Sequence, residues 1–384
     1  MAGLDQSWYA PEGIAESSGG APAIARGALV CYRLFDVGDE IRLDELLKLL
    51  SGTEARRMAL GSRHERLFEF SAAPVGLDLG ERPCAPLSFL GTARARAHFF
   101  NFGVVSISFE VALPERSLAA YIAVAAAVLD EPEITAAART VVDELSAKLR
   151  AAYRGVHHVD DYETFTLSFL QRLAGDAGPR DVLEWHGLGK LLAGETARGK
   201  LDARQREELL GCSYSYLEDD LAVIDYNAAL VLEPSGSRDI PLLLELANAQ
   251  LLALRYYDRL LDDDMRAIYE ELANLEKKRS IMRKRYGELA HRVIRRSVEV
   301  REFSDLIGNS IKVAGDFYLA RTYRGAIRRL RVGDWQESIS DKLTLASEVY
   351  TMLKGELEHS RSFYLEVLVV ILIVIEVVLA FVGH

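Results

Sequence analysis

The apolar stretch near the C-terminus constrains this chain most. Residues 363–382 read FYLEVLVVILIVIEVVLAFV, with Leu, Ile, Val or Phe at sixteen of twenty positions. About 20 such residues in a helix cross a hydrocarbon core of about 30 Å. Glu366 and Glu376 interrupt the run, but an acid near the middle costs about 3 kcal/mol, whereas the apolar side chains together contribute roughly −5 to −10 kcal/mol. The stretch therefore predicts a transmembrane anchor. The alternative is a fully buried helix in the core of an oligomeric soluble protein.

The flanks of this stretch predict its orientation. Only Gly383 and His384 follow it, whereas Lys342, Lys354 and Arg361 precede it. Basic residues mark the cytoplasmic side of a span, and the first residues resemble neither a secretory signal nor a mitochondrial transit peptide. We therefore expect a single-pass protein of the cytoplasmic (inner) membrane, with the bulk of the chain in the cytoplasm.

The cysteines indicate the redox compartment of the protein, and the distribution of charge along the sequence indicates a candidate binding segment. Cys31, Cys84 and Cys212 are widely separated and form no CxxC pair, which fits a reducing compartment. The net charge is −11. Residues 277–331, however, hold sixteen Lys and Arg against five Asp and Glu, so that this segment carries +11 and the rest of the chain −22. An acidic protein thus contains one basic segment.

The pattern before residue 234 predicts an α+β domain. Residues 1–25 are rich in Gly, Ala, Ser and Pro and are expected to be mobile. The predicted domain spans residues 26–233. Its strands and helices are mixed without the regular βαβα order of a parallel sheet. Strands are predicted at 28–37, 66–75, 95–103, 104–113, 161–170 and 219–232, and helices at 43–50, 115–130 and 133–152.

Beyond the loop at Pro234 the period becomes helical. A coiled-coil-like stalk or hairpin is predicted over 240–362, with helices at 242–261, from Met282 to Arg331 and from Asp334 into the transmembrane helix at 363–382. In the last helix a heptad seam runs through Ile339, Leu343, Ala346, Tyr350, Leu353 and Leu357. This seam predicts a parallel homo-oligomer, and an intrachain helical hairpin is the competing use of the same residues.

Several short motifs resemble the "required for meiotic nuclear division" family, a domain of unknown function. They are Phe99–Val105, Leu246–Leu251, Tyr286-Gly287-Glu288-Leu289 with Arg292, and the end Leu365-Glu366-Val367, Ile371-Leu372-Ile373 and Glu376-Val377. The family has Trp where this chain has Val367. The resemblance implies a bacterial-type member that is membrane-associated, oligomeric and non-enzymatic. Mitochondrial members are tied to organellar translation, which implies the ribosome or translation apparatus as partner.

Motifs for catalysis or cofactors are weak, and no cofactor is expected. Residues 194–200 fit the P-loop spacing, but Leu201 stands where Ser or Thr would bind Mg²⁺. Two groups of residues have side-chain atoms that could bind a metal ion. The first is His157, His158, Asp160 and Asp161, and the second is Glu218, Asp219, Asp220 and Asp225. Solvated turns beside strands explain both groups as well.

The basic segment is the candidate binding surface. Its members are Lys277, Lys278, Arg279, Arg283, Lys284, Arg285, Arg292, Arg295, Arg296, Arg321, Arg324, Arg328, Arg329 and Arg331. Such residues bind RNA or anionic lipid, or they pair with the acidic remainder of the chain. We therefore expect a non-enzymatic scaffold that holds a cytoplasmic partner at the membrane. The alternative is a membrane-tethered hydrolase or nuclease that uses Asp219, Asp220 and Asp225.

Overall fold

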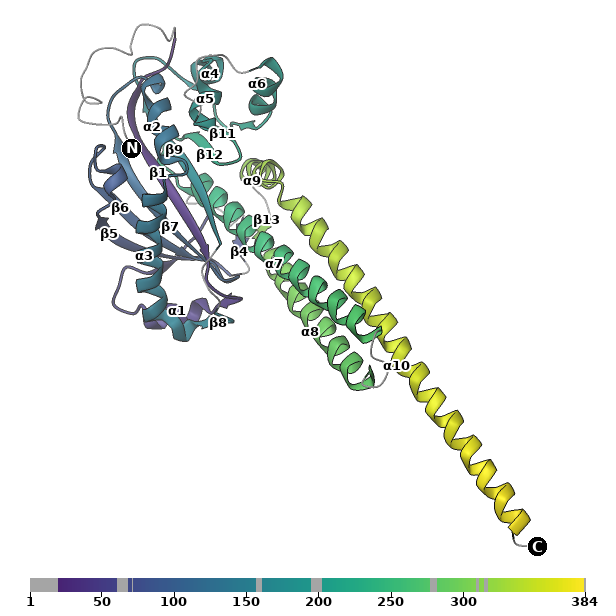
Figure 1. Ribbon diagram of the computed structural model, residues 1–384. Helices are drawn as coiled ribbons and strands as arrows, with labels where there is room; N and C mark the ends of the chain where they lie inside the picture. Colours follow the sequence, from purple (N-terminus) through teal and green to yellow (C-terminus); the bar gives the residue numbers. More distant parts are fainter. Residues whose placement is uncertain are drawn as a thin grey trace. The chain divides into compact units, whose positions relative to one another are not determined.

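The protein is described here by a computed structural model (Figure 1). It describes residues 20–60, 68–70, 72–156, 161–194, 202–276, 282–308, 311–313 and 317–382. By the contacts within the chain, these residues divide into two units. Residues 1–256 and 306–333 form an α/β unit, and residues 257–305 and 334–384 form a helical unit. The mixed α/β part followed by helices confirms this much of the predicted fold class.

The sheet of the α/β unit is nine-stranded, in the order β10-β11-β12-β9-β1-β7-β6-β5-β3. Its strands are β1 (Ile24–Asp36), β3 (Arg56–Arg57), β5 (Val75–Arg82), β6 (Ala93–Phe99), β7 (Val104–Leu113), β9 (Tyr162–Leu173), β10 (Ser213–Tyr214), β11 (Leu221–Ile224) and β12 (Ala228–Leu232). All pairs are antiparallel except β12 with β9. The predicted strand at 219–232 is therefore a hairpin, because the chain turns back after Ile224.

Strand β1 lies at the centre of the sheet, between β7 and β9. Cys31 is in register with Phe109 on one side and with Thr166 on the other. Its residues from Ala28 to Asp36 are all buried, on both faces. This explains why the sequence reads as a continuous apolar run rather than an alternating one.

Helices α2 (Tyr121–Val128) and α3 (Pro132–Leu149) cover one face of the sheet. Arg33 of β1 is fully buried on this face. Its guanidinium donates to Oγ1 of Thr135 at 2.9 Å and to the carbonyl oxygens of Val128 and Tyr32 at 3.0 and 2.9 Å. Because a buried charge is costly unless it is hydrogen-bonded, burial lowers the pKa of Arg33. The arginine thereby joins the end of α2 to the start of α3.

The other face of the sheet is covered by the first part of α7 (Asp239–Glu276), up to Tyr256. Leu243, Leu244 and Leu251 of this helix are buried. Nη1 of Arg255 also lies 2.5 Å from Oε2 of Glu163 on β9. The helix is apolar on the side that meets the sheet, which matches the predicted amphipathic helix at 242–261.

Smaller elements complete the α/β unit. They are α1 (Leu43–Leu49), α4 (Pro179–Glu184), α5 (Leu188–Ala193), α6 (Ala203–Leu210), α9 (Phe317–Arg329) and the two-stranded pairs β2 (Glu40–Ile41) with β8 (Tyr153–Arg154) and β4 (Phe68–Phe70) with β13 (Ile311–Val313). The predicted single helix from Met282 to Arg331 is wrong. It is broken into α8 (Met282–Gly308), β13 and α9, because Ile311–Val313 pair with β4 instead of continuing the helix.

The helical unit contains the second part of α7, α8 up to Asp305 and α10 (Val332–Val382) from Asp334. Tyr257 and Phe303 stack with ring centroids 3.6 Å apart. Nζ of Lys342 lies 2.7 Å from carboxylate oxygens of both Asp258 and Asp262. The first residues of the predicted seam, Ile339, Leu343 and Ala346, are buried within the chain, so this part of the seam is used inside the unit.

The predicted transmembrane helix is wrong. Among the helices that the structure describes, none combines the length and the apolar character needed to cross a membrane. The same finding contradicts the expected single-pass location in the cytoplasmic membrane. The side chains of Glu366 and Glu376 lie outside the described residues.

Candidate functional site: a charged cavity on the sheet

The predicted basic surface is only partly described. Lys277, Lys278 and Arg279 lie outside the described residues, as do the side chains of Arg283, Lys284 and Arg285. Arg292, Arg295 and Arg296 lie on α8, Arg321, Arg324, Arg328 and Arg329 lie on α9, and Arg331 follows α9.

Two arginines of this set pair with acids of their own unit. Nε of Arg296 lies 2.5 Å from Oδ2 of Asp264. Nη2 of Arg329 lies 2.6 Å from Oδ1 of Asp225, and Arg329 also pairs with Glu208. Arg324 and Arg328, by contrast, are exposed. The structure thus separates arginines that stabilise the fold from arginines that face solvent.

Two carboxylates of the acidic group at residues 218–225, those of Asp220 and Asp225, make structural contacts. The carboxylate of Asp220 is buried and accepts from the backbone N–H groups of Tyr216 and Leu217, at 2.7 and 3.2 Å. Asp225 accepts from Arg329 and from the N–H of Tyr226. These two carboxylates do not converge on an open site. Within the described ranges, no group of His, Cys, Asp and Glu could hold a metal ion.

The other predicted motifs are not brought into a site. His157, His158 and Asp160 lie outside the description, as do residues 195–201 of the P-loop-like stretch. Gly194 adopts φ 62° and ends α5. Burial raises the pKa of the Cys31 thiol to about 12 and that of Cys84 to about 11, so neither thiol is a reactive thiolate at neutral pH.

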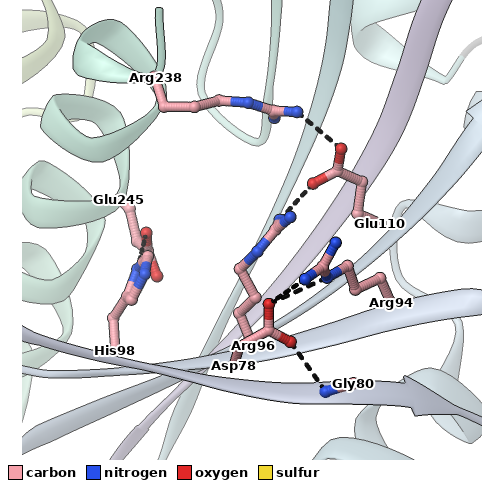
Figure 2. Close-up of polar contacts among 8 residues, drawn as sticks. All are labelled: Asp78, Gly80, Arg94, Arg96, His98, Glu110, Arg238 and Glu245. Atoms are coloured by element: carbon pink, nitrogen blue, oxygen red, sulfur yellow. Dashed lines mark hydrogen bonds and ion pairs between the residues drawn. The ribbon is translucent and has the colours of Figure 1, made fainter. Parts of the chain in front are cut away.

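A different group of residues meets on the face of the sheet that α7 covers. Successive side chains of a strand point to opposite faces. On β6 this places Ala95, Ala97 and Phe99 in the core, and it turns Arg94, Arg96 and His98 to the α7 face (Figure 2). Three basic side chains in a row on one strand face are the foundation of this candidate site.

Glu110 of β7 forms ion pairs with two arginines of the site. It accepts from Nη1 of Arg96, and its Oε1 lies 2.6 Å from Nη2 of Arg238 in the loop before α7 (Figure 2). The guanidinium of Arg238 also lies 4.0 Å from the centre of the Phe169 ring. Burial acts to raise the pKa of Glu110, but the charges and hydrogen bonds of Arg238 and Arg96 outweigh it and hold that pKa below its usual value.

Asp78 of β5 forms an ion pair with a third arginine, Arg94. Its Oδ2 accepts from Nη2 and Nε of Arg94 at 2.5 and 3.0 Å, and its Oδ1 accepts from the N–H of Gly80 at 2.8 Å. Gly80 adopts φ 69° at an irregularity in the pairing of β5 with β6. The hydrogen bond from Arg94 is the main reason that the pKa of Asp78 is lowered.

His98 and Glu245 form the other end of the site. Nδ1 of His98 lies 2.6 Å from Oε2 of Glu245 on α7. A carboxylate only accepts, so the proton of this hydrogen bond lies on Nδ1. The Glu245 side chain is only 2% exposed, yet its Oε1 has no hydrogen-bond partner in the described part of the chain. A Cβ on Gly76 would come within 2.6 Å of the Met58 sulfur and 3.1 Å of the His98 ring, so Gly76 leaves room for the imidazole.

These residues line a cavity of about 690 Å³. This volume lies in the range of small-molecule sites. Its charged lining comprises Glu54, Arg56, Asp78, Arg94, Arg96, His98, Glu110, Arg238 and Glu245. None of these residues was predicted from the sequence to belong to a site. The spacing of Arg94, Arg96 and His98 was visible as a pattern, but their partners on β5, β7 and α7 are set by long-range pairing.

The fold and cavity define an α/β protein with a charged pocket on one face of a mainly antiparallel sheet. The profile of the family described as "Uncharacterized protein MJ0711, N-terminal domain" matches residues 26–238, and the chain belongs to this family. The chain is also similar to "Uncharacterized protein MJ0711" of Methanocaldococcus jannaschii, with 25% identity over 179 residues, which are 45% of this chain and 52% of that protein. The chain thus spans about half the length of this relative. No solved structure matches the chain.

Proposed function

We propose that the protein is a non-enzymatic scaffold that assembles through α10 into a homo-oligomer. The observation that supports this is an exposed apolar run. Val369, Val370, Ile371, Leu372 and Ile373 are between 47% and 58% exposed. Consecutive residues of a helix point in directions about 100° apart, so five in a row present apolar surface on every side of the helix.

A second copy of the chain is the occupant that fits this surface. A helix that is apolar all round is stable in water only when other helices surround it. Another α10 brings an identical apolar surface, and cyclic symmetry lets the same residues meet one another. The helix also already packs through Ile339, Leu343 and Ala346 in its own unit, which leaves its distal part available for the oligomer.

The resemblance to the "required for meiotic nuclear division" family adds the class of partner. Mitochondrial members of that family are tied to organellar translation, and we propose on this ground that the scaffold holds the ribosome or translation apparatus. The exposed Arg324 and Arg328 of α9 provide positive charge for an RNA surface. The hydrolase alternative receives no such support, because Asp220 and Asp225 are held in structural contacts.

The mass of the full-length protein in solution tests the oligomer. We expect light scattering to give a multiple of 42.7 kDa, and Val370→Glu with Leu372→Glu to give a monomer with the same circular dichroism, because charges inside a helix bundle are not tolerated. Gln336→Glu with Ser347→Glu is the matched control, because both residues are exposed on the same helix. A monomeric unmodified protein, or a double variant that stays oligomeric, would refute the proposal.

A further inference from the structure

The cavity between β6 and α7 has an uneven distribution of charge. At one end Arg96 and Arg238 share the single carboxylate of Glu110, which leaves one positive charge in excess. Arg94 and Asp78 balance each other. Glu54 and Arg56 also line the cavity and carry opposite charges. At the other end Glu245 has one bond from His98 and an oxygen, Oε1, without a partner among the described residues. A ligand would therefore meet a cationic end and an acceptor end.

Besides the charge distribution, the unpartnered Oε1 of Glu245 also indicates a ligand. A buried acceptor without a donor costs about 1–3 kcal/mol, and buried polar groups in native proteins nearly always have a partner. The Glu245 side chain lines the cavity and is only 2% exposed. A donor supplied by a ligand in the cavity would remove this cost.

The distance between the two ends sets the length of the ligand. Arg238 immediately precedes α7 and Glu245 lies on it, so seven residues at 1.5 Å each separate their backbones by about 10 Å. An extended peptide of three residues covers about the same length, at up to 3.6 Å per residue. The first turn of α7, which includes Pro241 and Leu242, also lines the cavity, and a helix N-terminus favours negative charge.

We propose that this cavity binds a short zwitterionic peptide of two or three residues, with its carboxylate at Arg96 and Arg238 and its ammonium group at Oε1 of Glu245. A carboxylate is the group that arginine binds in a bidentate manner, and an ammonium group supplies the donors that Glu245 lacks. The proposal concerns the α/β unit alone and does not depend on the oligomer proposed above.

Free peptides, compared with peptides that have one end blocked, test the carboxylate contact and the ammonium contact separately. The full-length protein is titrated by calorimetry with glycine, diglycine, triglycine and tetraglycine, and then with N-acetyl-triglycine and triglycine amide. We expect diglycine or triglycine to bind most tightly in the length series. Each blocked form should bind about tenfold more weakly, since each loses one charge-assisted contact.

Two variants assign the contacts to residues. With Glu245→Gln, triglycine and N-acetyl-triglycine should bind equally, because the ammonium partner is gone. With Arg238→Gln, triglycine and triglycine amide should bind equally. Arg150→Gln, which removes an exposed arginine outside the cavity, should bind triglycine as the unmodified protein does. The comparison of blocked and free peptides on the unmodified protein keeps the test valid if a variant fails to fold.

Two results would overturn the proposal. One is that none of the free peptides binds at about 10 mM. This concentration is close to the weakest dissociation constant that we expect for so small a ligand. The other is that N-acetyl-triglycine or triglycine amide binds as tightly as triglycine to the unmodified protein. If N-acetyl-triglycine is the form that binds as tightly, equal binding of succinate would assign the cavity to simple anions.

Discussion

Nδ1 of His98 and Oε2 of Glu245 lie 2.6 Å apart although 147 residues of sequence separate them. The bond joins strand β6 to helix α7 inside the α/β unit. Because the Glu245 side chain is 2% exposed and that of His98 12% exposed, the pair is shielded from water. This contact therefore couples the stability of the fold to the candidate site.

Removal of one partner of this pair should be strongly destabilising. We expect His98→Ala to lower the free energy of unfolding by about 3 kcal/mol, since a buried carboxylate then loses its donor. His98→Leu combined with Glu245→Met should cost less than His98→Ala alone, because no buried charge remains. Urea unfolding measures both. In a double-mutant cycle with the single variants His98→Leu and Glu245→Met, a double variant that loses the sum of the two single losses would show that the residues do not interact.

The hydrogen bond from Arg33 to Thr135 should also be visible in stability. Thr135→Val keeps the shape of the side chain but removes the acceptor of the buried Nε of Arg33, so we expect a loss of about 1–3 kcal/mol in urea unfolding. Thr140→Val on the same helix is the matched control, because Thr140 is exposed and bonds only to the carbonyl of Ala136 among the described contacts. Equal effects of the two substitutions would contradict the assigned role of Arg33.

Glu110 should stabilise the protein at neutral pH but not in acid. Its pKa is lower in the folded protein than in the unfolded chain, where Glu titrates at about 4.3. The stability it contributes is therefore complete above the unfolded pKa and is lost as the pH falls through the folded pKa. Glu110→Gln should be less stable than the unmodified protein at pH 7, and the difference should vanish as the pH falls below the folded pKa of Glu110.

Glu163 provides a comparison of opposite sign. Burial raises its pKa, and the charge of Arg255 only partly offsets this. The ionised form is therefore disfavoured by folding, so Glu163→Gln should be as stable as the unmodified protein in acid and equally or more stable at pH 7. Urea unfolding at a series of pH values gives both curves. A Glu163→Gln variant that resembles Glu110→Gln would show that burial does not dominate at Glu163.

The exposed arginines of α9 should contact a polyanion if the protein binds RNA. We expect Arg324→Glu with Arg328→Glu to weaken binding of a single-stranded RNA oligomer and to lower the slope of log affinity against log salt by about 2, one for each lost phosphate contact. Arg329→Glu should instead lower the melting temperature, because it breaks the ion pairs with Asp225 and Glu208. Binding that is indifferent to salt and to the first two substitutions would leave these arginines without an RNA partner.

Local sequence patterns predicted much of the fold. The predicted helix at 43–50 is α1, and the predicted strands at 95–103 and 104–113 are β6 and β7. The alternation of these strands depends on neighbouring residues, as does the turn that joins them at Asn101 to Gly103, where Gly103 adopts φ 82°. The break between α8 and α9 was missed because it depends on β4, a strand more than two hundred residues earlier in the chain.

The candidate site was missed for the same kind of reason. Arg94, Arg96 and His98 share a strand face that the alternating pattern reveals. Nothing local, however, indicates that Glu110, Arg238 and Glu245 would meet them, since each comes from a different element. The predicted anchor at 363–382 is also wrong: it was inferred from local composition, whereas no helix among the described residues is long and apolar enough to cross a membrane.

The central position of β1 has a consequence for synthesis of the protein on the ribosome. Its two neighbours, β7 and β9, are both made later, and Tyr162 of β9 follows Asp36 by more than a hundred residues. At 5–20 residues per second, the apolar strand leaves the ribosome roughly 6 to 25 s before β9 exists to pair with it. During that interval its unpaired edge is open to other chains. A nascent chain of this protein therefore exposes an unpaired apolar strand for a longer time than a chain whose sheet is built from consecutive hairpins.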